Sequence, residues 1–187
     1  MPIIYRKGNL FDHIREGDCL IHVVNNVGLW GVGFVTPLSV MFPEVRLAYK
    51  HWETDVNILP VRITNTGRFK LGENQTVVCT PDRNERKGTF NKPIWIVNMV
   101  AQDGVRDGDN PHPLQYTALV DCLRHVERLV PKDKRIICPL IGAGLAGGDW
   151  TFISRLIEEI FADRKITVYV LHATDLPPQF RGELWQR

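Results

Sequence analysis

The sequence lacks the features that membrane proteins and nucleic-acid-binding proteins require. It has no run of about eighteen consecutive apolar residues and no apolar N-terminal segment of the signal-peptide kind. The formal net charge is only +2, and Lys and Arg are scattered except at Arg83–Lys87. Nucleic-acid-binding proteins gather positive charge into a stripe or patch. We therefore expect no membrane partner and no free nucleic acid as a partner.

Cysteine is scarce, and no two cysteines form a CxxC pair. The four cysteines are Cys19, Cys79, Cys122 and Cys138, and most lie in apolar segments. This usage is typical of buried free thiols in a reducing compartment, so we expect a cytoplasmic protein. We also expect no metal ion and no cofactor.

Three aspartates lie close together in one polar segment of the sequence. Asp103, Asp107 and Asp109 resemble a sparse calcium-binding run, but the trailing glutamate of an EF-hand loop is missing. A solvated loop is the interpretation that we favour.

The chain has the length of one ordinary globular domain. It contains 187 residues, of which 44% are apolar and 24% charged. We expect one domain over residues 1–173, a C-terminal tail over residues 174–187 that is packed on it or irregular, and a monomer.

Apolar, β-branched segments alternate with segments of helical periodicity. The expected strands are 3–6, 20–24, 58–63, 76–80, 94–99, 135–141 and 166–171. Helices are expected over 10–15, after Thr36–Pro37, after His112–Pro113 and from Trp150 to Phe161. Several strands are continuously apolar, as in a sheet covered on both faces. The pattern predicts a three-layer α/β/α domain with a mixed, largely parallel sheet.

Two glycine-rich segments follow apolar strands. Gly31-Val32-Gly33-Phe34 comes after Leu20–Val24, and Gly142–Gly148 comes after Ile136–Ile141. Glycine allows the backbone to approach a ligand closely, and exposed N–H groups bind anions. Together the two loops can hold a diphosphate, although each is also compatible with a simple tight turn.

The order and spacing of several motifs resemble the macrodomain family, which binds ADP-ribose. The segments that carry the resemblance are 5–11 (YRKGNLF), 21–34 (IHVVNNVGLWGVGF), 42–44 (FPE), 97–102 (VNMVAQ), 139–150 (PLIGAGLAGGDW) and 166–171 (ITVYVL). Within that family the sequence is similar to the branch that holds an ADP-ribose 1″-phosphate phosphatase and a terminal ADP-ribose glycohydrolase. The resemblance implies an α/β/α fold and ADP-ribose, or an ADP-ribosylated substrate, as partner.

The resemblance also implies where the ligand lies. Adenine is expected near Gly8-Asn9-Leu10, and the glycine loops are expected to hold the diphosphate and the distal ribose. The expected ligand-binding residues are Gly8, Asn9, Leu10, Asn25, Gly31, Val32, Gly33, Phe34, Ile141, Gly142, Ala143, Gly144, Leu145 and Ala146.

Three polar residues are candidates for catalysis, and each has a structural alternative. Asp149 is either a general base or the N-cap of the following helix. Asn26, with its neighbour Asn25, either binds ribose hydroxyls or a water molecule, or forms a turn. His22 is either an acid or base, or a hydrogen-bonded histidine of the core.

The sequence departs from the glycohydrolase pattern at two places. Residues 98–102 contain no lysine, and Ala146 stands near the position of that enzyme's catalytic aspartate. The function that we predict is a metal-independent hydrolase acting at C1″ of the distal ribose, with a non-catalytic ADP-ribose reader as alternative. A nicotinamide-dependent oxidoreductase is disfavoured because the first strand is not followed by GxGxxG.

Overall fold

The fold is built on one seven-stranded sheet. The computed structural model describes residues 3–52, 62–65, 70–79 and 92–185. The strand order is β1-β7-β6-β2-β5-β4-β3. The strands are β1 (Ile3–Lys7), β2 (Cys19–Asn25), β3 (Arg62–Asn65), β4 (Asn74–Cys79), β5 (Ile94–Gln102), β6 (Ile136–Cys138) and β7 (Ile166–Val170).

The sheet is mixed, and its parallel part extends from the edge strand β1 to β5. Strands β1, β7, β6, β2 and β5 run parallel to one another, whereas β4 is antiparallel to β5 and to β3. The carboxyl ends of the parallel strands therefore open onto one edge of the sheet. This arrangement confirms the predicted α/β class and the largely parallel sheet.

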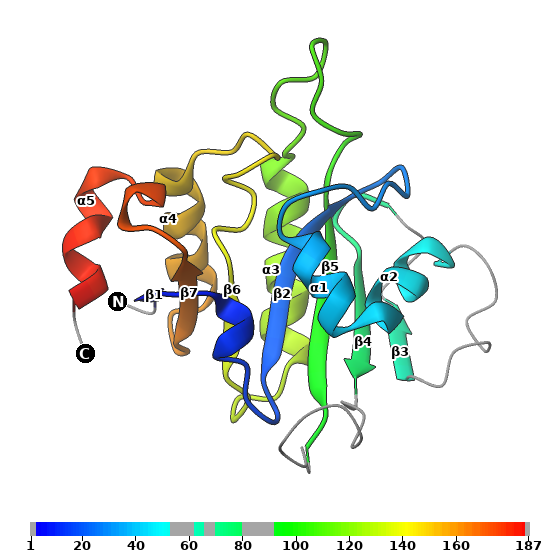
Figure 1. The fold of residues 1–187 in the computed structure, drawn as a ribbon, viewed down its shortest axis with the longest axis horizontal. Coiled ribbons are helices and arrows are strands. Elements are labelled where there is room, and N and C mark those ends of the chain that lie inside the picture. Colours follow the sequence, from blue (N-terminus) through cyan, green and yellow to red (C-terminus); the bar gives the residue numbers. More distant parts are fainter. Residues whose placement is uncertain (1–2, 53–61, 66–69, 80–91, 186–187) are drawn as a thin grey trace.

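Helices cover both faces of the sheet (Figure 1). The helical segments are η1 (Leu10–Asp12), α1 (Val35–Met41), α2 (Pro43–Lys50), α3 (Tyr116–Leu129), α4 (Trp150–Ile160), η3 (Ala173–Asp175), α5 (Pro178–Arg181) and η4 (Gly182–Trp185). Buried side chains of α3 and α4 form one cluster with the sheet, and those of η1, α1 and α2 form another. The predicted three layers are thus present.

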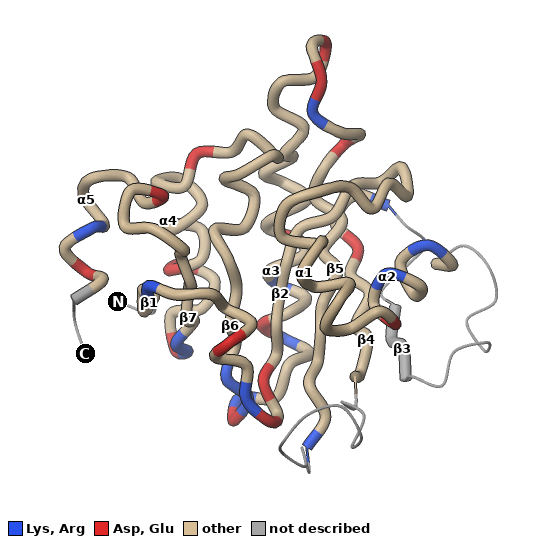
Figure 2. The backbone as a smooth tube through the Cα atoms, in the orientation of Figure 1, with Lys and Arg blue, Asp and Glu red and all other residues tan. Residues whose placement is uncertain are grey.

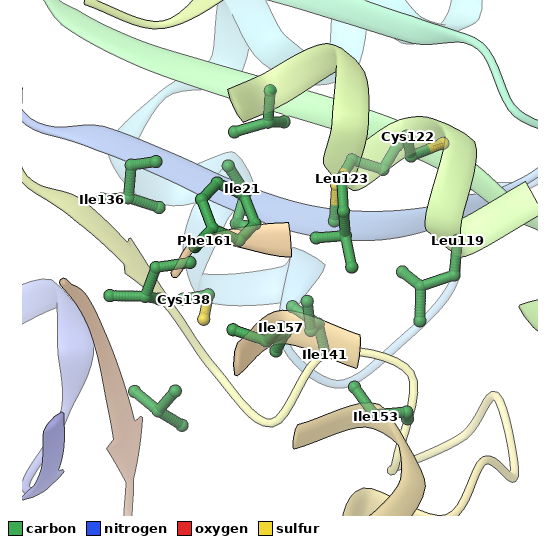
Figure 3. Close-up of a cluster of buried hydrophobic side chains, with 14 of the residues drawn as sticks. Ile21, Leu119, Cys122, Leu123, Ile136, Cys138, Ile141, Ile153, Ile157 and Phe161 are labelled. Atoms are coloured by element: carbon green, nitrogen blue, oxygen red, sulfur yellow. The ribbon is translucent and has the colours of Figure 1, made fainter. Parts of the chain in front are cut away.

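The larger cluster packs α3 and α4 against the central strands. Figure 3 shows Leu119 and Leu123 of α3, Ile153 and Ile157 of α4 and Ile21 of β2 turned toward a common interior. The helical residues recur at intervals of three or four, so each helix presents one apolar face to the sheet. The central strands are covered on both sides, which explains their continuous apolar sequences.

Charged residues of both signs are mixed on the surface. Figure 2 shows Lys and Arg interspersed with Asp and Glu along the described chain. Among the residues that the structure describes, no helix is long and apolar enough to cross a membrane.

The C-terminal segment packs on the domain. Leu176 is buried, and Phe180 and Leu184 contact the cluster beneath α3 and α4. The ring of Phe180 lies 5.7 Å from that of Tyr5 on the edge strand β1. The segment therefore covers an otherwise open sheet edge.

Two strand and helix boundaries near the second glycine loop differ from the prediction. The strand expected over 135–141 ends at Cys138, because Pro139 has no N–H to donate to a neighbouring strand. Helix α3 begins at Tyr116 and not after His112–Pro113, because Leu114 donates its N–H to the carbonyl of Ala146 and bridges Gln102.

Two predicted helix starts on the other face also differ. Thr36 and Pro37 lie within the first turn of α1 rather than before it, and the helix predicted over 10–15 is a single 3-10 turn capped by Asn9. Most of the strand predicted over 58–63 and nearly all of the loop predicted over 81–92 lie outside the described residues.

Candidate functional site

The main pocket opens at the carboxyl ends of the parallel strands. Its volume is about 980 Å³, and it is lined by residues from the loops that follow β1, β2, β5, β6 and β7. Ligands of open α/β sheets bind at this edge, and pockets for small molecules have volumes of roughly 300–1,000 Å³. The pocket is large enough for a dinucleotide-sized ligand.

The structure brings all the expected ligand-binding residues to this pocket. They line it from three segments: Gly8, Asn9 and Leu10; Asn25 and Gly31–Phe34; and Ile141–Ala146. His22 also lines it, whereas Asn26 and Asp149 do not.

Asn25 shapes the first glycine loop. Its Oδ1 accepts hydrogen bonds from the N–H groups of Val27 and Leu29 at 3.1 and 3.0 Å, and from the Tyr49 hydroxyl at 2.8 Å. Its Nδ2 donates to the carbonyl of Leu29 at 2.6 Å. The side chain is fully engaged, so the turn-forming interpretation applies, and Asn25 contributes to the pocket mainly by folding the loop.

Close packing holds the second glycine loop. Gly142 has a φ of +73°, and a Cβ there would lie 3.0 Å from Leu114. The N–H of Gly148 donates to the carbonyl of Gly142 at 2.8 Å, which closes the loop on itself. A side chain at either glycine would displace its neighbours, so both glycines are required by the fold.

Both loops leave backbone N–H groups without protein acceptors. Among the described residues, the N–H groups of Gly31, Gly33, Gly142 and Gly144 form no hydrogen bond with protein. All four residues line the pocket. Loop N–H groups without protein acceptors can provide hydrogen-bond donors for phosphate oxygens. The two loops can therefore bind an anion.

Gly31 and Gly144 differ from the other pocket glycines. Neither has positive φ, and no described atom lies within 4 Å of the place that a Cβ would take at either position. The fold alone does not require glycine there. A side chain would instead occupy the space through which a ligand approaches the backbone.

His22 is a buried residue of the pocket wall with one free ring nitrogen. Its side chain lies on β2, and its Nε2 contacts Oδ1 of Asn98 on β5 at 2.5 Å. Nδ1 is buried and has no hydrogen-bond partner among the described residues. Burial lowers the pKa of His22 to about 4, more than the hydrogen bond to Asn98 and the interaction with the backbone at Val23 raise it. The ring is therefore neutral near pH 7. The interpretation of His22 as a hydrogen-bonded core histidine explains Nε2, which is paired with Asn98, but does not explain the unpaired Nδ1.

Asn26 lies outside the pocket and joins two loops. Its Nδ2 donates to Oδ1 of Asp103 at 2.9 Å, and its Oδ1 accepts from the N–H of Gly104 at 2.8 Å. The first glycine loop is thereby tied to the loop after β5. Asp107 accepts from the N–H groups of Asp109 and Asn110 within that loop, so the acidic run has a structural role.

Asp149 is the N-cap of α4. Its Oδ1 accepts from the N–H of Thr151 at 2.8 Å, and its own N–H donates to the Tyr116 hydroxyl at 2.8 Å. This geometry is that of an N-cap, the structural alternative for Asp149, and the residue does not line the pocket. The structure gives no support for a general base at this position, and we do not propose one.

Sequence reasoning missed several residues that line the pocket. They are Gln102, Val105, Arg106, Tyr169, Leu171 and Asp175. Gln102 and Leu171 lie at or just after the carboxyl ends of β5 and β7, so the rule for open sheets could have identified them. Arg106 and Asp175 depend on how their loops fold back, for which the sequence carries no comparable signal.

Comparison with known proteins supports the same fold and family. No family model matches the sequence. An ADP-ribose 1″-phosphate phosphatase from Aspergillus clavatus is 26% identical over 184 residues, spanning 87% of this chain and 90% of that protein.

Two solved structures are similar in architecture. A macrodomain protein from Streptomyces coelicolor has a TM-score of 0.64 and 27% identity, over 90% of this chain and 98% of its own. Thermosipho africanus DarTG, solved in complex with ADP-ribose, has a TM-score of 0.71 over 98% of this chain and 46% of its own. At 16% identity the second likeness concerns the fold alone.

The strand order, the two glycine loops at the carboxyl edge of the sheet and the likeness in sequence agree with one another. The chain has the macrodomain fold and is similar in sequence to macrodomain proteins.

Proposed function

We propose that this protein is a metal-independent hydrolase of ADP-ribose derivatives, acting at the substituent on C1″ of the distal ribose, with ADP-ribose 1″-phosphate as its substrate class. The observation that carries the proposal is that both glycine loops line one pocket with residues whose N–H groups have no protein acceptor among the described residues. A diphosphate matches these donors in charge and in number of acceptor oxygens. The name of the Aspergillus clavatus relative supports the same ligand.

Arg106 favours a phosphate as the leaving group. Among the described residues that line the pocket, it is the one Lys or Arg. It stands on the loop after β5, which Asn26 and Asn110 hold in shape through hydrogen bonds to residues 103–105. A guanidinium there can pair with a phosphate on C1″ but gains less from a neutral ester of a protein carboxylate.

Hydrolysis needs a water molecule beside the phosphorus of the C1″ phosphate, and His22 offers an acceptor for it. With its ring neutral, Nδ1 can accept a hydrogen from water, and loop N–H groups can stabilise negative charge that develops on phosphate oxygens. The water oxygen forms a bond to phosphorus, the bond between phosphorus and the C1″ oxygen breaks, and the C1″ oxygen takes up a proton, so ADP-ribose and inorganic phosphate are released.

Product release and calorimetry together test the proposal. We expect phosphate release from ADP-ribose 1″-phosphate in the presence of a chelator, and weaker or no release from a glutamate-linked ADP-ribose. Arg106→Ala should lower kcat/KM for the phosphate substrate by about tenfold, the effect of losing one charge-assisted contact. Arg46→Ala on the exposed surface of α2 is the matched control. Loss of turnover with chelator, or equal effects of the two substitutions, would contradict the proposal.

One observation favours a reader module as second candidate. Asp175 is the one carboxylate among the described pocket residues, and its Oδ2 already accepts from the N–H of His172 at 2.8 Å. A pocket with few groups that exchange protons can bind without turnover. Calorimetric binding of ADP-ribose together with no product from either substrate would favour this candidate.

A further inference from the structure

A row of buried polar side chains leads from α2 to the wall of the pocket. His22, Asn98 and Gln75 lie side by side on the neighbouring strands β2, β5 and β4, because Asn98 pairs in register with both of the others. Residues in register lie on the same face of a sheet. None of the three is more than 2% exposed.

The hydrogen bonds in this row have a direction that the backbone of α2 fixes. The carbonyl of Ala48 can only accept, so Gln75 presents its Nε2 to it at 2.9 Å. The remaining oxygen of Gln75 can only accept, so Asn98 presents its Nδ2 to it at 2.9 Å. Asn98 is left with Oδ1 facing Nε2 of His22, which must therefore carry the ring proton.

The other ring nitrogen is consequently an acceptor. Nδ1 carries a lone pair, is buried, and has no hydrogen-bond partner among the described residues. The His22 side chain to which it belongs lines the pocket. Trp30, Phe34 and Asn98 contact the ring and carry no charge, and no charged group among the described residues contributes to the shift of the His22 pKa. Within the described part of the chain, no charge therefore draws the proton from Nε2 to Nδ1.

We infer that Gln75 and Asn98 are positioning residues that lock His22 as the Nε2–H tautomer, so that Nδ1 is a permanent acceptor for a hydroxyl group or water in the pocket. The catalytic part of this inference rests on the proposed function. The tautomer itself does not, because it follows from the hydrogen-bond row alone.

Nitrogen-15 NMR of the histidine rings tests the tautomer without any activity. We expect His22, assigned by loss of its signals in His22→Asn, to show a protonated Nε2 and a bare Nδ1 at pH 7. His112 is an internal reference of opposite kind, because its Nδ1 lies 2.9 Å from the carbonyl of Gly147 and must donate when the ring is neutral. A proton on Nδ1 of His22, or a rapidly exchanging mixture, would overturn the inference.

Substitutions in the row separate positioning from folding. Gln75→Leu removes the acceptor that fixes the orientation of the Asn98 amide. Either end of that amide can then face Nε2 of His22, so the His22 signals should report both tautomers. We expect kcat to fall by about tenfold with little change in KM, which corresponds to about 1.4 kcal/mol in the transition state. Asn98→Asp keeps an acceptor at Nε2 and should retain the Nε2–H tautomer.

The outcomes distinguish the two proposals. If His22 shows the Nε2–H tautomer but the protein releases no product, the inference that Gln75 and Asn98 fix the tautomer holds and the hydrolase proposal fails. If product is released but Gln75→Leu changes neither tautomer nor kcat, the hydrolase stands and the row does not position His22.

Discussion

Gly31 and Gly144 have open space where a Cβ would stand, although both line the pocket. We expect Gly144→Val to weaken ADP-ribose binding by about tenfold or more, because the side chain enters the path of the phosphates. The free energy of unfolding should change by less than about 0.5 kcal/mol, since the fold leaves room for it. Calorimetric titration and thermal unfolding measure the two effects.

The matched control for that substitution is Gly108→Val. Gly108 also has no positive φ and no described atom within 4 Å of where its Cβ would stand, but it does not line the pocket. Equal loss of affinity in the two variants would show that Gly144 has no special place beside the ligand.

Asp149 caps α4 and is also the carboxylate that the sequence offered as a general base. Asp149→Ala should lower the free energy of unfolding by about 1 kcal/mol, because the N–H of Thr151 loses its cap. Asp149→Asn keeps an acceptor oxygen and should be nearly as stable as the wild type. We expect both variants to retain turnover. An Asn variant that is stable but inactive would reinstate the carboxylate as a general base.

Burial of His22 makes the protein sensitive to acid. Its pKa is about 4 in the fold, against 6.5 for an exposed imidazole. Above pH 6.5 the ring is neutral in both states, so it contributes nothing to the pH dependence. As the pH falls from 6.5 to 4, the unfolded chain gains a proton that the fold excludes, and the free energy of unfolding decreases by roughly 3 kcal/mol.

Denaturant unfolding of the wild type and His22→Asn across this pH range measures that contribution. The curve of the variant should be flatter by the stated amount between pH 7 and 4. Parallel curves would mean that His22 titrates normally in the folded protein.

At the scale of elements, the edge strand β1 depends on the helical segments that follow Leu176. Phe180 of α5 packs on Tyr5 and on the cluster beneath α3 and α4. We expect Phe180→Ala to lower the free energy of unfolding by about 1–3 kcal/mol, less than for a fully buried ring because Phe180 is partly exposed.

Gln179→Ala is the control on the same helix, because Gln179 is exposed and donates only to the Thr151 hydroxyl. If Phe180→Ala were as stable as Gln179→Ala, residues 174–187 would be an appendage and not part of the domain.

The sequence predicted the elements better than their ends. The apolar strands and the amphipathic faces of α3 and α4 could be predicted because the spacing of apolar residues is a property of neighbouring positions in the chain. The start of α3 was not, because Leu114 is held by the carbonyl of Ala146, which lies in a loop far along the chain.

At the scale of the whole molecule, the pocket is assembled from loops after five strands, so a ligand that bridges them should stabilise the entire fold. We expect ADP-ribose at a hundred times its Kd to raise the free energy of unfolding by about 2.7 kcal/mol. ATP and NAD at the same concentration should give smaller shifts. Thermal unfolding with each nucleotide measures this, and equal shifts for all three would contradict selective recognition of ADP-ribose.

The fold class and the segments that line the pocket could be predicted from the sequence, because glycine loops after apolar strands are features of contiguous residues. Which polar residues face the pocket depended on contacts between segments that are far apart in the chain. Asn26 and Asp149 adjoin the same loops but are engaged in loop bonding and capping. His22 owes its free acceptor to Asn98 and Gln75 on other strands, and only the register of the sheet places those side chains in one row.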